Sequence, residues 1–241
     1  MAALVTDAFS FPENTALFLD FDGTLVAFKD DPDTVHLSTT EAELLVQVSG
    51  ALSGAVALIS GRDLRDLSSR VPRGLWRLGN HGMFKSPPGE MPSDKLPDIP
   101  SNLAQTLENL ITPLEGTWLE KKGPVAAIHY RLSPENGPTL LSKLGSLKLE
   151  PYGYIFQAGN NVIDLKPRGA NKGIALTDLM SIEPFKSRIP IMIGDDTTDE
   201  DAFLAASNLN GFGIKMGSGI TQARYRLPSI GDLYRLLRTL L

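Results

Sequence analysis

Four aspartates stand directly after two short apolar runs of the chain. They are Asp20, Asp22, Asp195 and Asp196. Side chains two positions apart in an extended chain point the same way, so we expect the carboxylates of Asp20 and Asp22 on one face, with Phe21 turned into the core. Such close like charges favour a divalent cation, and Mg²⁺ prefers oxygen ligands of this kind. We therefore predict that these four residues form a Mg²⁺ site.

Asp22 and the acidic residues after Thr198 also have structural interpretations. Asp22 precedes a glycine, and Asp-Gly is a common turn pair. Thr198 is suited to cap a helix whose first turn would hold the acidic residues 199–201, because the helix dipole favours negative charge there. We therefore expect structural roles for Glu200 and Asp201. The aspartates directly after the second apolar run precede this cap, so capping does not explain them.

A second group of residues is suited to hold a phosphate. Ser60-Gly61-Arg62 lies at a predicted strand-to-helix junction, where a hydroxyl and free backbone N–H groups can cradle phosphate oxygens. Lys172 begins a predicted helix and can neutralise both a carboxylate nucleophile and the phosphoryl group that it attacks. The alternatives are that Ser60 only caps the helix and that Lys172 is a solvated charge. The predicted phosphate-binding residues are Thr24, Ser60, Gly61, Arg62 and Lys172.

Together these groups predict the hydrolysis of a phosphate ester in two steps. Asp20 would be the nucleophile and would form an aspartyl-phosphate, which splits one difficult displacement into two easier ones. Asp22 would protonate the leaving oxygen as a general acid and then deprotonate the attacking water. Mg²⁺ and Lys172 would stabilise the charge of the transferring group. The predicted catalytic residues are therefore Asp20, Asp22 and Lys172.

The elements that must position these groups alternate between strand and helix. Apolar runs at residues 16–19, 55–59 and 189–193 predict buried strands, and helical spacing is present at 39–52 and 172–180. This order predicts an α/β fold with a parallel sheet. Ligands of such sheets bind outside the carboxyl ends of the strands, so the polar clusters that end these strands are expected to converge.

The middle of the chain has a different composition. Five prolines between residues 86 and 100 exclude a regular element there and predict a linker or an exposed loop. After it we expect helices over residues 101–112 and 138–147. We expect strands over residues 125–130, 154–157 and 162–165. We therefore predict a separate α+β domain over residues 86–167 and a parallel-sheet domain formed by residues 1–85 and 168–241.

Four motifs, in order along the chain, resemble those of the haloacid dehalogenase-like phosphatases. They are Asp20-Phe21-Asp22-Gly23-Thr24, Ser60, Lys172 and Gly194-Asp195-Asp196-Thr197-Thr198-Asp199. The resemblance implies a Rossmann-like core with a cap domain inserted between the second and third motifs, where the α+β segment lies. It also implies Mg²⁺ held by Asp20, the backbone carbonyl of Asp22, and Asp195.

Longer stretches are similar to the trehalose-6-phosphate phosphatases over nearly the whole chain. These stretches are Gly194–Phe203, Glu120–Gly123, His129–Arg131 and Lys166–Gly173. The resemblance implies hydrolysis of trehalose 6-phosphate, the last step of trehalose biosynthesis. It also implies a cap that binds the sugar through Glu120, Lys122 and Asp164.

Three features of the chain leave parts of this resemblance open. The family generally has Glu where this chain has Asp164, so the shorter carboxylate is expected to reach the sugar less well or through a water. The family often has Ala-Glu where this chain has Met83-Phe84. His129 and Arg131 are interpretable as a buried strand pair that satisfies itself.

Composition narrows the class of protein further. The 241 residues carry a formal net charge of -5 and a pI near 5.3, which argues against a broad surface for nucleic acid or an anionic membrane. The chain has no cysteine, which excludes disulfides and thiolate chemistry and suits the cytosol. With no signal peptide or membrane-spanning run, we expect a cytoplasmic protein. Nothing in the sequence demands more than a monomer, and the resemblance implies a small-molecule sugar phosphate as its partner.

Three other functions stay open at this point. The first is a phosphatase of broader specificity for sugar phosphates. The second is a non-catalytic sugar-phosphate-binding domain, which the intact motif carboxylates disfavour. The third is a phosphotransferase that passes the phosphoryl group from the same covalent intermediate to a sugar.

Overall fold

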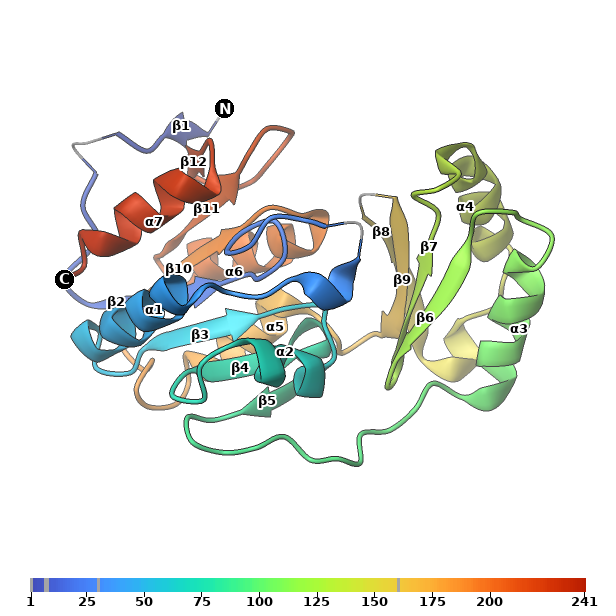
Figure 1. Cartoon of the computed structure of the whole chain (residues 1–241), viewed down its shortest axis with the longest axis horizontal. Helices are drawn as coiled ribbons and strands as arrows, with labels where there is room; N and C mark the ends of the chain where they lie inside the picture. Colours follow the sequence, from blue (N-terminus) through green and yellow to red (C-terminus); the bar gives the residue numbers. More distant parts are fainter. Residues whose placement is uncertain (1, 7–8, 30, 160) are drawn as a thin grey trace. The chain divides into compact units, whose positions relative to one another are not determined.

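The chain divides into two compact units. The computed structural model describes residues 2–6, 9–29, 31–159 and 161–241 (Figure 1). One unit comprises Met1–Pro92 and Asn171–Leu241, and the other comprises Ser93–Ala170. The first change of unit falls after the predicted boundary at residue 86, because Nη2 of Arg77 donates hydrogen bonds to the carbonyls of Pro87 and Glu90 at 2.9 and 2.6 Å. These contacts keep the first prolines on the larger unit.

The larger unit is built on an eight-stranded sheet in the order β1-β12-β11-β10-β2-β3-β4-β5. Its strands are β1 (Ala3–Leu4), β2 (Thr15–Leu19), β3 (Val56–Ile59), β4 (Trp76–Gly79), β5 (Phe84–Ser86), β10 (Ile189–Gly194), β11 (Phe212–Met216) and β12 (Tyr225–Leu227). Neighbouring strands are parallel except for β4 and β5. The predicted α/β class with a mostly parallel sheet is confirmed.

The central strands are buried on both faces, which explains their continuous apolar sequences. Every residue of β2 and β3 is buried. The backbone N–H of Asp20 donates to the carbonyl of Ile193 at 2.9 Å, so β2 and β10 end side by side. Side chains that follow these two strands therefore start from neighbouring points of the same sheet edge.

The helices of this unit lie on both faces of the sheet. They are α1 (Thr39–Ala51), α2 (Leu64–Arg70), α5 (Lys172–Leu179), α6 (Glu200–Asn208) and α7 (Ile230–Arg238). Figure 1 shows α1 and α7 in front of the sheet and α5 and α6 behind it. Side-chain caps set the starts of two helices that carry site residues. Asp63 accepts a hydrogen bond from the N–H of Arg65 at 2.8 Å, and Asn171 accepts one from the N–H of Gly173 at 2.8 Å.

The smaller unit is a four-stranded antiparallel sheet with helices against one face. The sheet order is β6-β7-β9-β8, and the elements are α3 (Ser101–Ile111), β6 (Trp118–Lys122), β7 (Val125–His129), α4 (Gly137–Gly145), β8 (Tyr154–Ala158) and β9 (Val162–Pro167). Ala126, Ile128 and Ile163 pack with leucines of both helices, such as Leu107 and Leu140, in one core. Residues of alternate positions lie on the opposite face of the sheet.

Among the described residues, no helix combines the length and the apolar composition needed to cross a bilayer.

Candidate active site

A buried ion-pair network lies at the carboxyl edge of the central strands. Nζ of Lys172, at the start of α5, donates to Oδ1 of Asp20 at 2.7 Å and to Oδ1 of Asp199 at 2.6 Å. All three side chains are almost fully buried. The predicted contact between Lys172 and the carboxylate of Asp20 is therefore present, and the interpretation of Lys172 as a solvated charge is wrong.

A third carboxylate joins this network from the end of β10. Oxygens of Asp20, Asp195 and Asp199 all lie within 4.8 Å of one another. The hydroxyl of Thr24 lies 3.4 Å from Oδ1 of Asp195. Gly23 has a φ of +81°, and a Cβ at this position would lie 2.3 Å from Oδ2 of Asp195. The turn after β2 therefore requires a glycine to approach this carboxylate so closely.

The charges of the network do not balance within the protein. The carboxylates of Asp20, Asp195 and Asp199 face the single ammonium of Lys172. Burial and the neighbouring carboxylates, acting against the attraction of Lys172, raise the pKa of Asp20 well above its usual range and that of Asp195 to about 6. Burial favours the neutral form of Lys172, but the charges of Asp199 and Asp20 outweigh it and raise the pKa of Lys172, which stays protonated. A buried set of carboxylate oxygens with excess negative charge fits a hard divalent cation such as Mg²⁺.

Lys215 adds a further link to this site that the sequence analysis missed. It lies on the buried strand β11, and its ammonium donates to the backbone carbonyl of Asp195. The contact orients the backbone directly after β10. A lysine inside an otherwise apolar, buried strand was the available signal, because buried lysines are rare without a partner.

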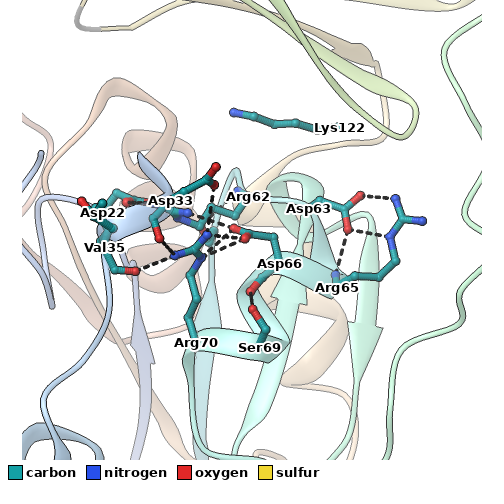
Figure 2. A network of polar contacts seen from close by, with 12 residues as sticks. Asp22, Asp33, Val35, Arg62, Asp63, Arg65, Asp66, Ser69, Arg70 and Lys122 are labelled. Carbon is teal, nitrogen blue, oxygen red and sulfur yellow. Dashed lines mark hydrogen bonds and ion pairs between the residues drawn. The ribbon is translucent and has the colours of Figure 1, made fainter. Parts of the chain in front are cut away.

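Asp22 does not join the acidic network. Both of its carboxylate oxygens accept from Arg62, with Nε to Oδ2 and Nη2 to Oδ1 each at 2.7 Å (Figure 2). Nη1 of Arg62 donates to Asp66 at 2.9 Å, so each of the three guanidinium nitrogens of Arg62 is engaged by a carboxylate. Burial disfavours the charge of Arg62, but Asp22 and Asp66 outweigh it and raise its pKa. In the structure Arg62 therefore holds Asp22, and phosphate binding by Arg62 stays a prediction.

The predicted phosphate loop after β3 is shaped by contacts from a second loop. Oγ of Ser60 accepts from the N–H of Arg62 at 3.1 Å, whereas Asp63 caps α2, so the alternative of Ser60 as the helix cap is wrong. The N–H groups of Asn80 and His81 donate to the carbonyls of Arg62 and Ser60 at 2.7 and 2.9 Å. Asn80 and His81 have φ values of +54° and +57°, in the left-handed region. This strained turn holds the phosphate loop through backbone hydrogen bonds. The sequence signal for the turn was an Asn before His-Gly, because Asn adopts the left-handed conformation more readily than most residues.

The acidic motif after β10 differs from its prediction at three positions. Asp196 does not belong to the group of clustered carboxylates but is the N-cap residue before the 3₁₀ turn η5 (Thr197–Asp199). Its N–H donates to Oδ2 of Asp199 at 3.0 Å. The predicted cap at Thr198 is wrong, because Thr198 lies inside this turn. Asp199, expected in the first turn of a helix, lies in the 3₁₀ turn and is fully buried against Lys172. A metal-binding role for Asp196 stays a prediction.

A second polar group lies on the face of the smaller unit's sheet that is opposite its helices. Glu120 on β6 pairs in register with Ala127 on β7, which pairs with Asp164 on β9, so the two carboxylates flank a small residue on one face. Oε2 of Glu120 lies 2.7 Å from Nε2 of His129 and 3.1 Å from Nζ of Lys122. Burial favours the neutral form of Glu120, but His129 and Lys122 outweigh it and lower its pKa to about 2.

His129 is held in this group from its other side. Its ring stacks on that of Trp118 with the centroids 4.7 Å apart and the planes 12° apart. The predicted buried pair of His129 and Arg131 is wrong, because β7 ends at His129 and Arg131 lies in the following turn. The structure pairs His129 with Glu120 instead.

Comparison with known proteins decides the family. The sequence profile of the trehalose-phosphatase family matches residues 18–230, which span both units. The chain belongs to the trehalose-phosphatase family. It is 35% identical over 225 residues to the trehalose-6-phosphate phosphatase of Escherichia coli (strain K12), an alignment that covers 92% of this chain and 85% of that protein. It is 32% identical over 247 residues to a probable trehalose-phosphate phosphatase of Sinorhizobium fredii, covering 100% and 91% of the two chains.

Solved structures support the same fold for this member of the trehalose-phosphatase family. The C-terminal domain of the C. albicans trehalose-6-phosphate phosphatase has a TM-score of 0.79 at 22% identity, with 95% of this chain and 92% of that chain covered. A haloacid dehalogenase-like hydrolase from Bacteroides thetaiotaomicron has a TM-score of 0.67 at 16% identity, with 95% and 100% covered. These neighbours place the family member in the haloacid dehalogenase-like fold, as its motifs predict.

Proposed function

We propose that this protein is a Mg²⁺-dependent phosphatase that hydrolyses trehalose 6-phosphate to trehalose and phosphate, the last step of trehalose biosynthesis. The observation that carries the proposal is the buried Asp20, bonded to Lys172 and flanked by the carboxylates of Asp195 and Asp199, in a chain of the trehalose-phosphatase family. A charged sugar phosphate does not cross membranes, so the cytoplasm is the proposed location. The proposed acting unit is the monomer.

Asp20 is the proposed nucleophile. Lys172 holds its Oδ1, so Oδ2 is the oxygen that attacks phosphorus while the bond from phosphorus to the sugar oxygen breaks. The proton of the Asp22 carboxyl passes to that oxygen. Asp22 then takes a proton from water as the water attacks phosphorus and breaks the bond to Asp20, which releases inorganic phosphate.

The remaining groups of the larger unit bind the phosphoryl group and the metal. Thr24, Ser60, Gly61, Arg62 and Lys172 are the proposed phosphate-binding residues. The proposed ligands of Mg²⁺ are Asp20, the backbone carbonyl of Asp22, and Asp195, with Asp199 in the same carboxylate group and Asp196 as a further candidate. When bound, Mg²⁺ supplies positive charge that stabilises the oxygens of the transferring group.

The cap residues give the proposed specificity for the sugar. Glu120 and Asp164 flank Ala127 on one face of the cap sheet, and Lys122 lies beside Glu120. Two acceptors and a donor around a small floor residue suit the hydroxyls of a disaccharide. The shorter Asp164 favours the second candidate, a phosphatase with broader specificity for sugar phosphates.

Phosphate release from a panel of substrates tests the proposal. The panel is trehalose 6-phosphate, glucose 6-phosphate, mannose 6-phosphate and sucrose 6-phosphate, each with Mg²⁺ and with EDTA. We expect Mg²⁺-dependent turnover with trehalose 6-phosphate preferred by orders of magnitude in kcat/KM. Similar rates across the panel would replace the named substrate with the broader class, and no turnover on any ester would leave a binding domain. Phosphoryl transfer to an added sugar would instead identify a phosphotransferase.

A further inference from the structure

Asp22 stands at one end of a chain of alternating charges that runs into helix α2. Arg62 binds both oxygens of Asp22 and donates from Nη1 to Oδ2 of Asp66. Asp66 in turn accepts from Arg70, with Nη2 to Oδ1 at 2.5 Å and Nε to both oxygens at 2.9 Å. Figure 2 shows these four side chains meeting above α2. We call them the Asp22–Arg70 relay.

The far end of the relay is anchored in the backbone. The side chain of Arg70 is only 5% exposed, and its Nη1 donates to the carbonyls of Val35 and Asp33 at 2.7 and 3.1 Å. Asp66 and Arg70 lie four positions apart on α2, so the helix itself sets their separation. The anchored end is therefore rigid, because two protein elements fix the guanidinium of Arg70.

The other end of the relay is the contact between Arg62 and the carboxylate of Asp22, and its orientation depends on how Arg62 is held. Arg62 has a long side chain, and its planar fork fixes the plane of any carboxylate that it binds through two nitrogens. Asp66 holds the third nitrogen and so fixes the rotation of that fork. The ring of Phe21, 5.5 Å from the guanidinium carbon, supports the guanidinium from another side. Arg62 thus sets the carboxylate plane of Asp22, and Asp66 influences that plane through Arg62.

We propose that Asp66 and Arg70 are positioning residues that act through Arg62 to orient the carboxyl group of Asp22 for proton transfer to the leaving oxygen. The inference rests on the proposed role of Asp22 as general acid and base. A proton is transferred well only over a short, aligned contact, so a carboxyl group that rotates freely loses part of its catalytic effect. Neither residue needs to contact the substrate for this role.

The leaving group provides the decisive readout. A sugar alkoxide is a strong base and leaves only with a proton, whereas p-nitrophenolate is a weak base and leaves without one. The value of kcat/KM reports on steps up to departure of the leaving group, before the water step that both esters share. Loss of acid positioning should therefore lower kcat/KM for the sugar ester and spare the aryl ester.

The test compares Asp66→Asn and Arg70→Met with wild type in the presence of Mg²⁺, on trehalose 6-phosphate and on p-nitrophenyl phosphate. We expect kcat/KM for the sugar ester to fall about 10- to 100-fold and kcat/KM for the aryl ester to change less than about threefold. Arg70→Lys should recover part of the loss. Arg65→Met is the matched control, since Arg65 lies on the same helix and pairs with Asp63 outside the relay. It should change neither rate.

Additivity separates the relay from a general effect on folding. If Asp66 acts through Arg62, Asp66→Asn should add little to the loss caused by Arg62→Met. Thermal unfolding of each variant shows whether it is folded. If Asp66→Asn does not fold, the more conservative Asp66→Glu is tested in its place. Equal losses on both esters, or no loss on either, would overturn the inference while leaving the proposed function intact. A wild-type protein that hydrolyses neither ester would overturn both.

Discussion

Replacing Lys172 by methionine should destabilise the larger unit strongly in the absence of metal. The ammonium of Lys172 is 2.7 Å from Asp20 and 2.6 Å from Asp199, and its side chain is 2% exposed. Removal of one partner from a buried ion pair costs about 3–5 kcal/mol, because the remaining charge is left buried without compensation. Two carboxylates lose their counter-ion here. We expect the free energy of unfolding in EDTA to fall by about 3–5 kcal/mol.

An exposed ion pair of the same length provides the control for Lys172→Met. Nζ of Lys121 lies 2.7 Å from Glu108, but these side chains are 50% and 42% exposed. Pairs of this kind contribute about 0–1 kcal/mol, so Lys121→Met should have little effect. Urea unfolding of Lys172→Met is followed in a Trp118→Phe background, where Trp76, packed on Phe185, is the single tryptophan and reports on the larger unit. Unfolding of Lys121→Met is followed in a Trp76→Phe background, where Trp118 reports on the smaller unit that contains Lys121 and Glu108. Equal costs for the two lysine variants would refute the reasoning about burial.

Three further predictions concern the cap and the phosphate loop. Glu120→Ala should raise KM for trehalose 6-phosphate about 10- to 100-fold and leave kcat/KM for p-nitrophenyl phosphate nearly unchanged; parallel losses would contradict sugar binding. Because the pKa of Glu120 lies near 2 instead of its ordinary 4.5, its stabilising effect is complete above pH 4.5 and is lost as the pH falls toward 2. The difference in unfolding free energy between wild type and Glu120→Gln should therefore shrink over that range. A difference that grows on acidification would contradict the lowered pKa of Glu120. Gly61→Ala should cost about 1–3 kcal/mol in urea unfolding, since its Cβ would lie 2.9 Å from Cε1 of His81, whereas Gly74→Ala, with open space around it, should cost little.

The central strands were predictable because parallel strands buried on both faces have continuous apolar sequences. Residues of β2, β3 and β10 therefore stood out, and so did the polar residues that follow them. Strands β6 and β11 were missed for a physical reason. The sequence of β6 is rich in charge because it is an edge strand, and β11 includes Gly213 and Lys215, which break an apolar run.

The site was predictable as far as local sequence determines it. Asp20 and Lys172 were both predicted as catalytic residues, and the structure brings them into contact. Asp199 was missed because an acidic residue in the first turn of a helix has a sufficient local explanation. Its partner lies 27 positions earlier, on another element. The pairing of Asp22 with Arg62, 40 positions apart, was likewise set by the tertiary fold and not by spacing.

The most direct test of the account is a search for a phosphoryl group on Asp20. Wild-type protein is mixed with trehalose 6-phosphate and Mg²⁺, quenched in acid during turnover, and digested for mass spectrometry, with Asp20→Asn treated in parallel. We predict a phosphorylated peptide that includes Asp20 in the wild type, and in Asp20→Asn neither that peptide nor measurable phosphate release. A phosphoryl group on another residue, or an Asp20→Asn variant that still releases phosphate at a rate close to wild type, would contradict the assignment of Asp20 as the nucleophile.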